Sequence, residues 1–113
     1  MPLLSITTNC EISTQADELP QTASRLIAES LGKPERYVMV SLQHNPHMTF
    51  AGIRDPLAYL ELKSIGLPEN KTADLSAALC GLMQEKLGIP ADRVYIEFSN
   101  AKGSLWGWNN STF

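Results

Sequence analysis

The sequence predicts a mixed α/β (α+β) domain in which two tandem βαβ units form one four-stranded sheet with both helices on one face. The first observation behind this prediction is an internal repeat, because Leu31–Val40 is echoed by Leu87–Ile96. The second is that each half has the same order of signals: a strand-like run, a helical period, a Leu-Gly stop and another strand-like run. The third is length, since 113 residues suffice for one domain with a core but not for two. We therefore expect residues 1–113 to form a single domain.

The two halves of the repeat align with a small difference in length. Gly32 corresponds to Gly88, whereas Arg36 corresponds to Arg93 only if one residue is added to the second half. The alignment therefore predicts that the connection after the second helix is one residue longer than its counterpart.

The first half is expected to contain a strand, a helix and a second strand, at residues 2–7, 19–31 and 38–42. Apolar residues recur on one side of the helical stretch, as in an amphipathic helix. Asp17 is a candidate N-cap and Pro20 fits the first helical turn. Gly32 followed by Pro34 is typical of a helix that ends on a left-handed glycine.

The second half repeats this order, with a strand, a helix and a strand expected at residues 58–65, 70–87 and 94–98. Asn70 is the candidate N-cap, and Gly88 with Pro90 marks the end of the helix. A short βαβ unit closes by a right-handed crossover into parallel strands, so each unit should supply one parallel pair.

The helix-free face of the predicted sheet is expected to be partly covered by other subunits. Apolar residues occur at both odd and even positions of the strands, as in Val38–Val40 and Val94–Phe98. Strands of a sheet with one solvent-exposed face would instead alternate apolar and polar residues. The last stretch, Ala101–Phe113, combines glycines with Trp106, Trp108 and Phe113 and has no helical or strand period. Such a stretch suits an arm that packs on a neighbour or lines a pocket.

Composition excludes several classes of function. The formal charge is −3 and the basic residues are scattered, so the chain lacks the basic stripe that nucleic-acid binding needs. The sequence contains no membrane-spanning run and no secretory leader, so we expect no membrane partner and a cytoplasmic location, with export by a leaderless route left open. His44 and His47 flank a proline without a third ligand nearby, so no metal site is expected.

Pro2 is a candidate catalytic base. It directly follows the initiator methionine, and its small ring should allow removal of Met1. The free secondary amine would start from a reference pKa of about 7.7–8.0, from which a modest downward shift gives a neutral base at physiological pH. Taken on its own, Pro2 fits better the reading of a common second residue that has no catalytic role.

The whole chain resembles the macrophage migration inhibitory factor family of the tautomerase superfamily. The resemblance is carried by short motifs in matching order and spacing: Met1-Pro2, Gly32-Lys33-Pro34, Ser64-Ile65-Gly66, Leu79-Cys80-Gly81-Leu82, Asp92-Arg93-Val94-Tyr95-Ile96 and Gly107-Trp108-Asn109-Asn110-Ser111-Thr112-Phe113. It implies two βαβ units per subunit, an amino-terminal proline base, and a homotrimer with active sites between subunits.

The resemblance also implies roles for individual residues. Pro2 would be the general base, Lys33 would pair with the substrate carboxylate, and the backbone N–H of Ile65 would donate to the same anion. The family's tyrosine falls on Tyr95, contributed by the adjacent subunit. Its aromatic wall falls on three positions, Tyr37, Trp108 and Phe113. Trp106 replaces a small aliphatic residue of the mammalian factor, which implies a narrower or more stacking pocket mouth.

Two departures from the family pattern affect what can be carried over. Glu97 stands in place of an asparagine, and a carboxylate there would repel a carboxylate substrate and favour protonated Pro2. Three alternatives stay open: a cation pairs with Glu97, Glu97 is protonated and donates to the substrate, or Glu97 points away. The family's Cys-x-x-Cys is Leu57-Ala58-Tyr59-Leu60 here, so thiol-exchange activity is not expected.

The resulting hypothesis is a cofactor-independent keto–enol tautomerase for phenylpyruvate-type 2-keto acids. Such a reaction needs a base whose pKa lies near the working pH, and Lys33 could both lower the pKa of Pro2 and stabilise a developing enolate. Position alone favours the reading of Lys33 as a lysine that complements the helix dipole at a helix end, and only the match to Pro2 and Ile65 favours the binding role. The alternative function is a cytokine-like interaction protein with a vestigial pocket. Hydration or dehalogenation of small unsaturated acids, which also uses an amino-terminal proline in the superfamily, stays open.

Overall fold

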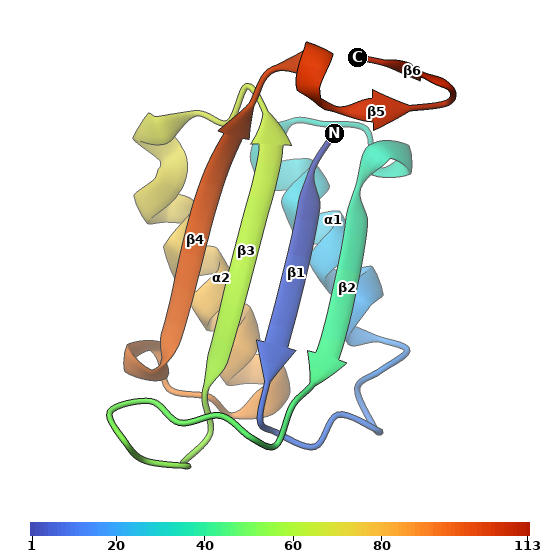
Figure 1. Cartoon of the computed structure of the whole chain (residues 1–113). Coiled ribbons are helices and arrows are strands. Elements are labelled where there is room, and N and C mark those ends of the chain that lie inside the picture. The colour runs from blue at the N-terminus through green and yellow to red at the C-terminus, as the bar shows by residue number, and fades with distance from the viewer.

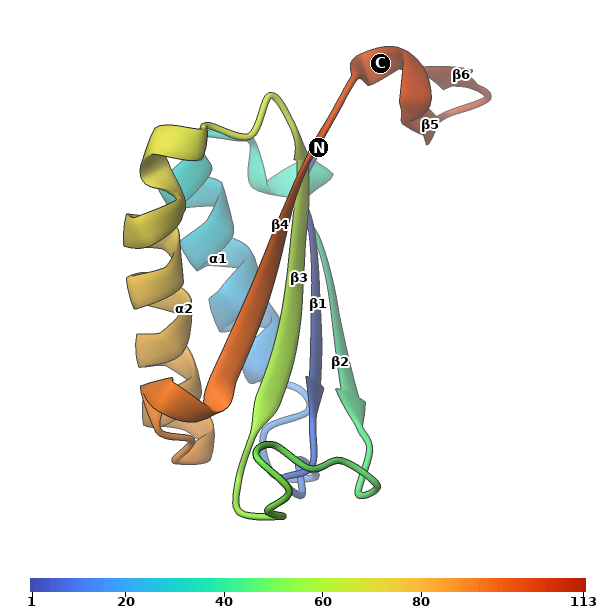
Figure 2. The same ribbon diagram turned by 60° about the vertical axis from the view of Figure 1, so that its left-hand side comes forward.

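A computed structural model describes all residues, 1–113, and contains a four-stranded mixed sheet with two helices. The strands and helices are, in chain order, β1 (Leu3–Thr8), α1 (Leu19–Leu31), β2 (Met39–His44), β3 (Ala58–Ile65), α2 (Thr72–Leu87) and β4 (Val94–Ala101). The spatial order of the strands is β2-β1-β3-β4 (Figure 1). Both helices lie on one face of the sheet and the other face has no helix over it (Figure 2). The predicted architecture of the chain is therefore confirmed.

Each βαβ unit forms a parallel pair, and the two units meet through antiparallel strands. β1 pairs with β2 and β3 pairs with β4 in parallel, whereas β1 pairs with β3 in antiparallel orientation. The central antiparallel pair was not specified by the sequence. It follows from placing two similar units side by side about a local twofold axis.

The core lies between the sheet and the two helices. The strict alternation of buried and half-buried residues along β3 turns Leu60 and Leu62 toward the helices, where the fully buried Ile27 and Leu79 belong to the same cluster. Each fully buried leucine or isoleucine contributes roughly 1.5–3 kcal/mol relative to exposure. This packing fixes the register of the sheet, because a shift by one residue would turn polar side chains into the core.

The helices end as predicted but begin differently. Gly32 and Gly88 follow α1 and α2 in the left-handed region, with φ values of 62° and 67°. Neither Asp17 nor Asn70 is an N-cap: the cap positions are Glu18 and Lys71, with no side-chain cap hydrogen bond at either. A preceding turn of backbone takes over this role, as where the Leu19 N–H donates to the Gln15 carbonyl at 2.9 Å.

A turn of 3₁₀ helix, Glu69–Lys71, precedes α2, so the helix begins at Thr72 rather than at residue 70. The hydroxyl of Thr72 donates to the Glu69 carbonyl at 2.9 Å and closes this turn. The strands also differ at their ends, since β2 covers 39–44 rather than 38–42 and β4 continues past residue 98 to Ala101.

The expected extra residue in the second half is absent. Leu3 lies opposite Met39 and Ala58 lies opposite Val94, which is the same separation along the chain in both halves. Glu35–Tyr37 and Ala91–Arg93 are matching 3₁₀ turns at the same distance from Gly32 and Gly88. The structural counterpart of Arg93 is therefore Tyr37 rather than Arg36, because backbone geometry rather than side-chain identity sets the equivalence.

The helix-free face of the sheet is mostly polar. Its centre carries serine, threonine, glutamine, glutamate and lysine side chains, at positions 5, 7, 41, 43, 61, 63, 97 and 99. On this face the exposed large apolar side chains are those of Met39 and Tyr95, at the starts of β2 and β4, and each is 66% exposed. The larger apolar residues of this face lie toward the strand ends, at Leu3, Met39, Tyr59, Ile65 and Tyr95, and coverage of the face by other subunits stays a prediction.

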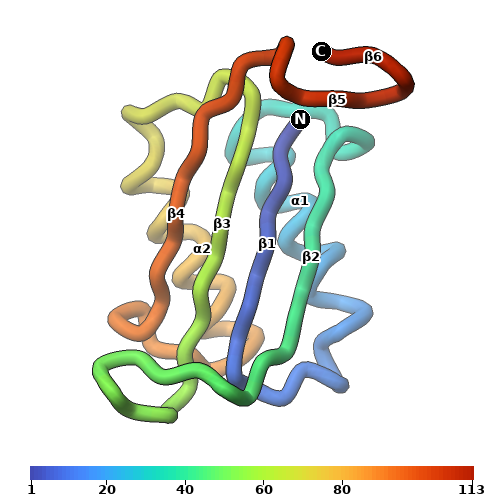
Figure 3. Tube along the Cα trace, in the orientation of Figure 1, coloured from blue at the N-terminus to red at the C-terminus, as the bar shows by residue number.

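The C-terminal stretch forms a short arm over one end of the sheet. A 3₁₀ turn, Gly103–Leu105, leads into β5 (Gly107–Trp108) and β6 (Ser111–Thr112), which pair as a hairpin. Asn109 and Asn110 have φ values of 53° and 64°, as a two-residue hairpin turn requires. The trace shows both chain termini at this end of the sheet (Figure 3). Neither α1 nor α2 has the length and apolar character needed to cross a lipid bilayer.

Candidate functional site

A pocket of about 350 Å³ lies between the start of β1 and the C-terminal arm. The start of the chain, the 3₁₀ turn before β2, and the arm each contribute part of its lining. Five predicted site residues surround it: Pro2, Tyr37, Trp106, Trp108 and Phe113. Segments from both ends of the chain are therefore brought together here.

Three aromatic rings form one wall of the pocket. The Tyr37 ring meets the Trp108 and Phe113 rings edge to face, with centroids 5.4 and 5.6 Å apart. Trp108 and Phe113 are stacked at 5.2 Å. These geometries suit aromatic pairs, each of which contributes about 0.5–1.5 kcal/mol beyond burial. The wall therefore offers flat apolar surfaces to a ligand ring.

The arm that carries this wall closes on itself. The Phe113 N–H donates to the Trp106 carbonyl at 3.2 Å. A Cβ added to Gly103 would lie only 2.7 Å from the Phe113 carbonyl oxygen, so a larger residue would push the chain end away. Gly103 thus helps to hold Phe113 against Tyr37.

Pro2 lines the same pocket, and it is buried beneath a half-buried Met1. Its carbonyl accepts from the Met39 N–H at 3.0 Å, which anchors the chain start to β2. Burial lowers the pKa of the α-amino group at Met1, and the positive charge of Lys33 lowers it further. An amine at this end of the chain is thus placed where its neutral form is favoured.

Lys33 and Ile65 lie near the chain start but outside the lining of the pocket. Lys33 is half-buried and follows Gly32, and its N–H donates to the Ala28 carbonyl at 3.0 Å to close α1. Ile65 lies on β3 two residues beyond Lys63, which pairs with Leu3, so it is level with Met1. Both are next to the chain start.

Tyr95 and Glu97 are remote from this pocket within one chain. Tyr95 pairs with Tyr59, which pairs with Thr7 at the far end of β1. Strand rise and strand spacing put Tyr95 roughly 15 Å from the start of β1. The ring of Tyr95 instead contacts Phe50 with centroids 4.7 Å apart.

Glu97 is held by a hydroxyl of its own chain. The Tyr59 hydroxyl donates to Glu97 Oε2 at 2.7 Å and also lies 3.1 Å from Glu61 Oε1. Glu97 forms no ion pair, since the two salt bridges of the chain are Lys63–Glu61 and Lys86–Glu18. Within one chain Glu97 is therefore turned to Tyr59, and no cation pairs with it.

Besides Met1, five residues of the pocket lining were not predicted as site residues. Four of them lie close to predicted ones along the chain or across the sheet: Leu3, Val38, Met39 and Gly107. The fifth is Arg36, which the sequence shows only as one of several scattered basic residues. Its position directly before Tyr37 is the signal that could have identified it.

No group of three or more metal-binding side chains converges anywhere in the chain. The ring of His44 instead lies 3.3 Å from the Asn9 carbonyl oxygen, through Nε2, and His47 lies in the exposed loop after β2.

Comparisons with known proteins agree over the whole chain. A family model described as macrophage migration inhibitory factor (MIF) matches residues 1–113. A curated homologue from Brugia malayi is 38% identical over 114 residues, covering 100% of this chain and 99% of that protein. The solved structure of a homologue from Prochlorococcus marinus has a TM-score of 0.93 and 47% identity, covering 98% of each chain. The factor from Trichinella spiralis has a TM-score of 0.93 and 34% identity, covering 98% of this chain and 99% of that one. The chain therefore belongs to the macrophage migration inhibitory factor family.

Proposed function

We propose that this protein is a cofactor-independent keto–enol tautomerase of phenylpyruvate-type 2-keto acids, in which Pro2 is the general base after removal of Met1. The observation that carries the proposal is the position of Pro2 beside an aromatic pocket, at a chain end where burial and Lys33 lower the pKa of an α-amine. Loss of Met1 would expose the Pro2 nitrogen to the space that Met1 now covers.

The neutral amine moves the proton. In the enol-to-ketone direction, Pro2 accepts the proton of the enol oxygen and delivers a proton to the adjacent carbon, and the reverse reaction uses the same steps in the opposite order. An amine with a pKa near neutrality can be unprotonated before the first transfer and can release the proton after it. The lowered amine pKa thus matches the requirement of the reaction.

Lys33 and the backbone N–H of Ile65 bind the substrate carboxylate in this proposal. A fixed cation near the reacting carbon orients the acid and stabilises negative charge on the enolate. The aromatic rings of Tyr37, Trp108 and Phe113 pack against the substrate ring. Trp106 narrows the mouth of the pocket on the side of the arm.

The working unit in this proposal is a homotrimer with sites at the subunit interfaces. Tyr95 is 66% exposed and lies at the opposite end of the sheet from Pro2, so a neighbouring subunit is needed to bring it to the site. Glu97 would accompany Tyr95 while its carboxylate keeps the hydrogen bond from the Tyr59 hydroxyl.

The test begins with the intact mass of the purified protein, which should lack Met1. The Pro2→Gly variant, which still permits removal of Met1 but replaces the secondary amine, should lose turnover of phenylpyruvate while keeping its oligomeric state and circular dichroism. A Pro90→Gly variant is the matched control, since it also loses a proline in the same fold but far from the pocket. Undiminished turnover by Pro2→Gly would refute the proposed base.

A cytokine-like interaction role is the second candidate, favoured by the names of the family's curated members. It predicts a folded protein that turns over no 2-keto acid and binds a protein partner saturably. The same turnover assay therefore separates the two candidates.

A further inference from the structure

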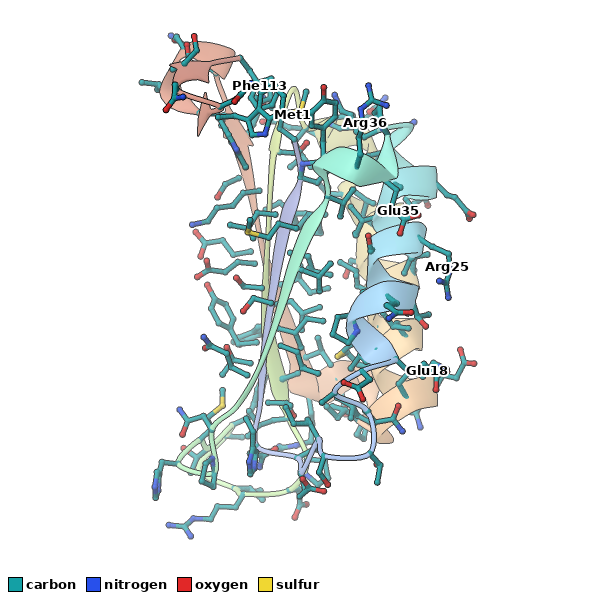
Figure 4. The ribbon with its side chains drawn as sticks, turned by 90° about the vertical axis from the view of Figure 1, so that its right-hand side faces the viewer. Met1, Glu18, Arg25, Glu35, Arg36 and Phe113 are labelled. Carbon is teal, nitrogen blue, oxygen red and sulfur yellow. The ribbon has the colours of Figure 1, made fainter.

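Arg36 is a charged residue of the pocket with no assigned role. It lines the pocket together with Met1, Pro2 and the aromatic wall. Its guanidinium carbon lies 4.8 Å from the centroid of the Tyr37 ring, so the charge is held against one face of that wall. Figure 4 shows Arg36 extended at the same end of the molecule as Met1 and Phe113.

The guanidinium of Arg36 has no acidic partner in the chain. Both salt bridges of the chain use lysines, and no hydrogen bond involves the Arg36 side chain. The adjacent Glu35 does not neutralise it, because its side chain lies toward α1 while that of Arg36 extends to the end of the molecule (Figure 4). Arg36 thus presents unused hydrogen-bond donors beside an apolar wall.

Arg93, in contrast to Arg36, is an arginine with a structural role in this fold. Its guanidinium donates to four backbone carbonyls of the loop before β3, those of Phe50, Ile53, Asp55 and Pro56, at 2.9–3.2 Å. That arginine is fully occupied in fixing a loop. Arg36 fixes nothing by hydrogen bonds, so its donors are available to a ligand.

Two cations therefore lie on one short connection: Lys33, near the amine but outside the pocket lining, and Arg36, in the lining against the aromatic wall. A substrate with one carboxylate needs one of them. We propose that the pocket selects 2-keto acids that carry a second carboxylate at the end remote from the keto acid, and that Arg36 binds this second carboxylate. The inference rests on the proposed tautomerase function, because that function places the first carboxylate at Lys33.

The geometry of a guanidinium suits this role. Its planar fork can donate two parallel hydrogen bonds to a carboxylate, and stacking on Tyr37 restricts its orientation. The chain start, the aromatic wall and Arg36 line the same pocket, so an acid with its keto group at the amine and its ring on the wall can reach Arg36 with the far end of the ring. A ring-substituted acid such as (4-carboxyphenyl)pyruvate has this arrangement of charges.

The kinetic test compares (4-carboxyphenyl)pyruvate with phenylpyruvate as substrates. The kcat/KM for (4-carboxyphenyl)pyruvate divided by that for phenylpyruvate should fall about fivefold in Arg36→Gln, which is the effect expected on losing a partly exposed ion pair. The fall should come mainly from a higher KM for the dicarboxylate. Arg36→Lys should restore part of the ratio. Arg25→Gln is the matched control, because Arg25 is exposed on α1 away from the pocket (Figure 4). Rising salt should reduce the preference of the native protein.

A binding measurement separates this inference from the proposed function. Calorimetry with the unreactive 3-phenylpropanoate and 3-(4-carboxyphenyl)propanoate reports the preference without turnover. A preference that is lost in Arg36→Gln but kept in Arg25→Gln supports the inference even if neither keto acid is turned over, in which case the tautomerase proposal alone fails. An unchanged ratio in Arg36→Gln, or an equal loss in Arg25→Gln, would overturn the inference.

Discussion

The charges of individual residues affect the pKa of the amine at the chain start, which is the base in the proposed mechanism. From the sequence, Glu97 was expected to work against a neutral amine, since a carboxylate beside Pro2 would stabilise the protonated form. In the structure the Glu97 carboxylate instead accepts a hydrogen bond from the Tyr59 hydroxyl. This hydrogen bond is the largest cause of the raised pKa of Tyr59. The Tyr59 hydroxyl thus donates a hydrogen bond to the carboxylate, and no cation of the same chain pairs with Glu97.

Lys33 has the opposite influence on the chain start, and this gives a pH-dependent prediction. Its positive charge contributes to the lowered pKa of the α-amine. Removing the charge in Lys33→Gln should raise the amine pKa, so that the rising limb of kcat/KM moves to higher pH. We expect a displacement of some tenths of a unit to about one unit.

The pH profile is measured with phenylpyruvate on the native protein and on two variants. Lys71→Gln is the control, because Lys71 is exposed before α2 and should leave the limb in place. The direction is fixed by the chemistry: a lowered amine pKa extends the active range to lower pH. A limb at the same pH in Lys33→Gln would mean that Lys33 does not tune the base.

The ends of the two helices give a matched pair of variants at the level of secondary structure. Gly32 and Gly88 both occupy the left-handed region, and neither has a close neighbour that an added Cβ would contact. Replacing either by alanine therefore tests backbone strain alone, which costs about 1–2 kcal/mol. Urea denaturation should show a similar loss for both variants.

These two variants should differ in activity. Gly32 directly precedes Lys33, so strain there displaces the proposed carboxylate-binding residue, whereas Gly88 ends the other helix. We expect Gly32→Ala to lower kcat/KM and Gly88→Ala to leave it close to the native value. Equal activity in the two variants would mean that the end of α1 does not position Lys33.

The helices and strands that the sequence predicted well are those with a strong local pattern. The helix over residues 19–31 and the strand over 58–65 have the predicted bounds, because apolar periodicity and a terminal glycine define them. The caps at Asp17 and Asn70 failed because backbone carbonyls of preceding turns satisfy the first N–H groups, which leaves no signature in side chains. The alignment of Arg36 with Arg93 was wrong because it matched two arginines that lie at different distances from Gly32 and Gly88. The backbone turns after these glycines have equal spacing, and they set the true equivalence.

At the scale of the molecule, the residues around Pro2 could be predicted only in part. The aromatic arm was recognisable from its composition, and its closure over the chain start brings Trp108 and Phe113 to Tyr37. Arg36 was not recognisable, because a single basic residue has no pattern until the fold places it against a ring. The resemblance to the family supplied Tyr95, which no feature of one chain connects to Pro2.

The separation of Pro2 and Tyr95 within one chain leads to the prediction that most directly tests the assembly. If sites form between subunits, Pro2→Gly and Tyr95→Ala damage different sides of the same interface. Each variant alone should have little activity. Denaturing them together and refolding the equal mixture should then restore about a quarter of the native sites, because a native site needs Pro2 from one variant and Tyr95 from the other. The measurements are phenylpyruvate turnover of the mixture and sedimentation velocity to verify trimers. Activity equal to the average of the two separate variants would show that Pro2 and Tyr95 do not meet across subunits.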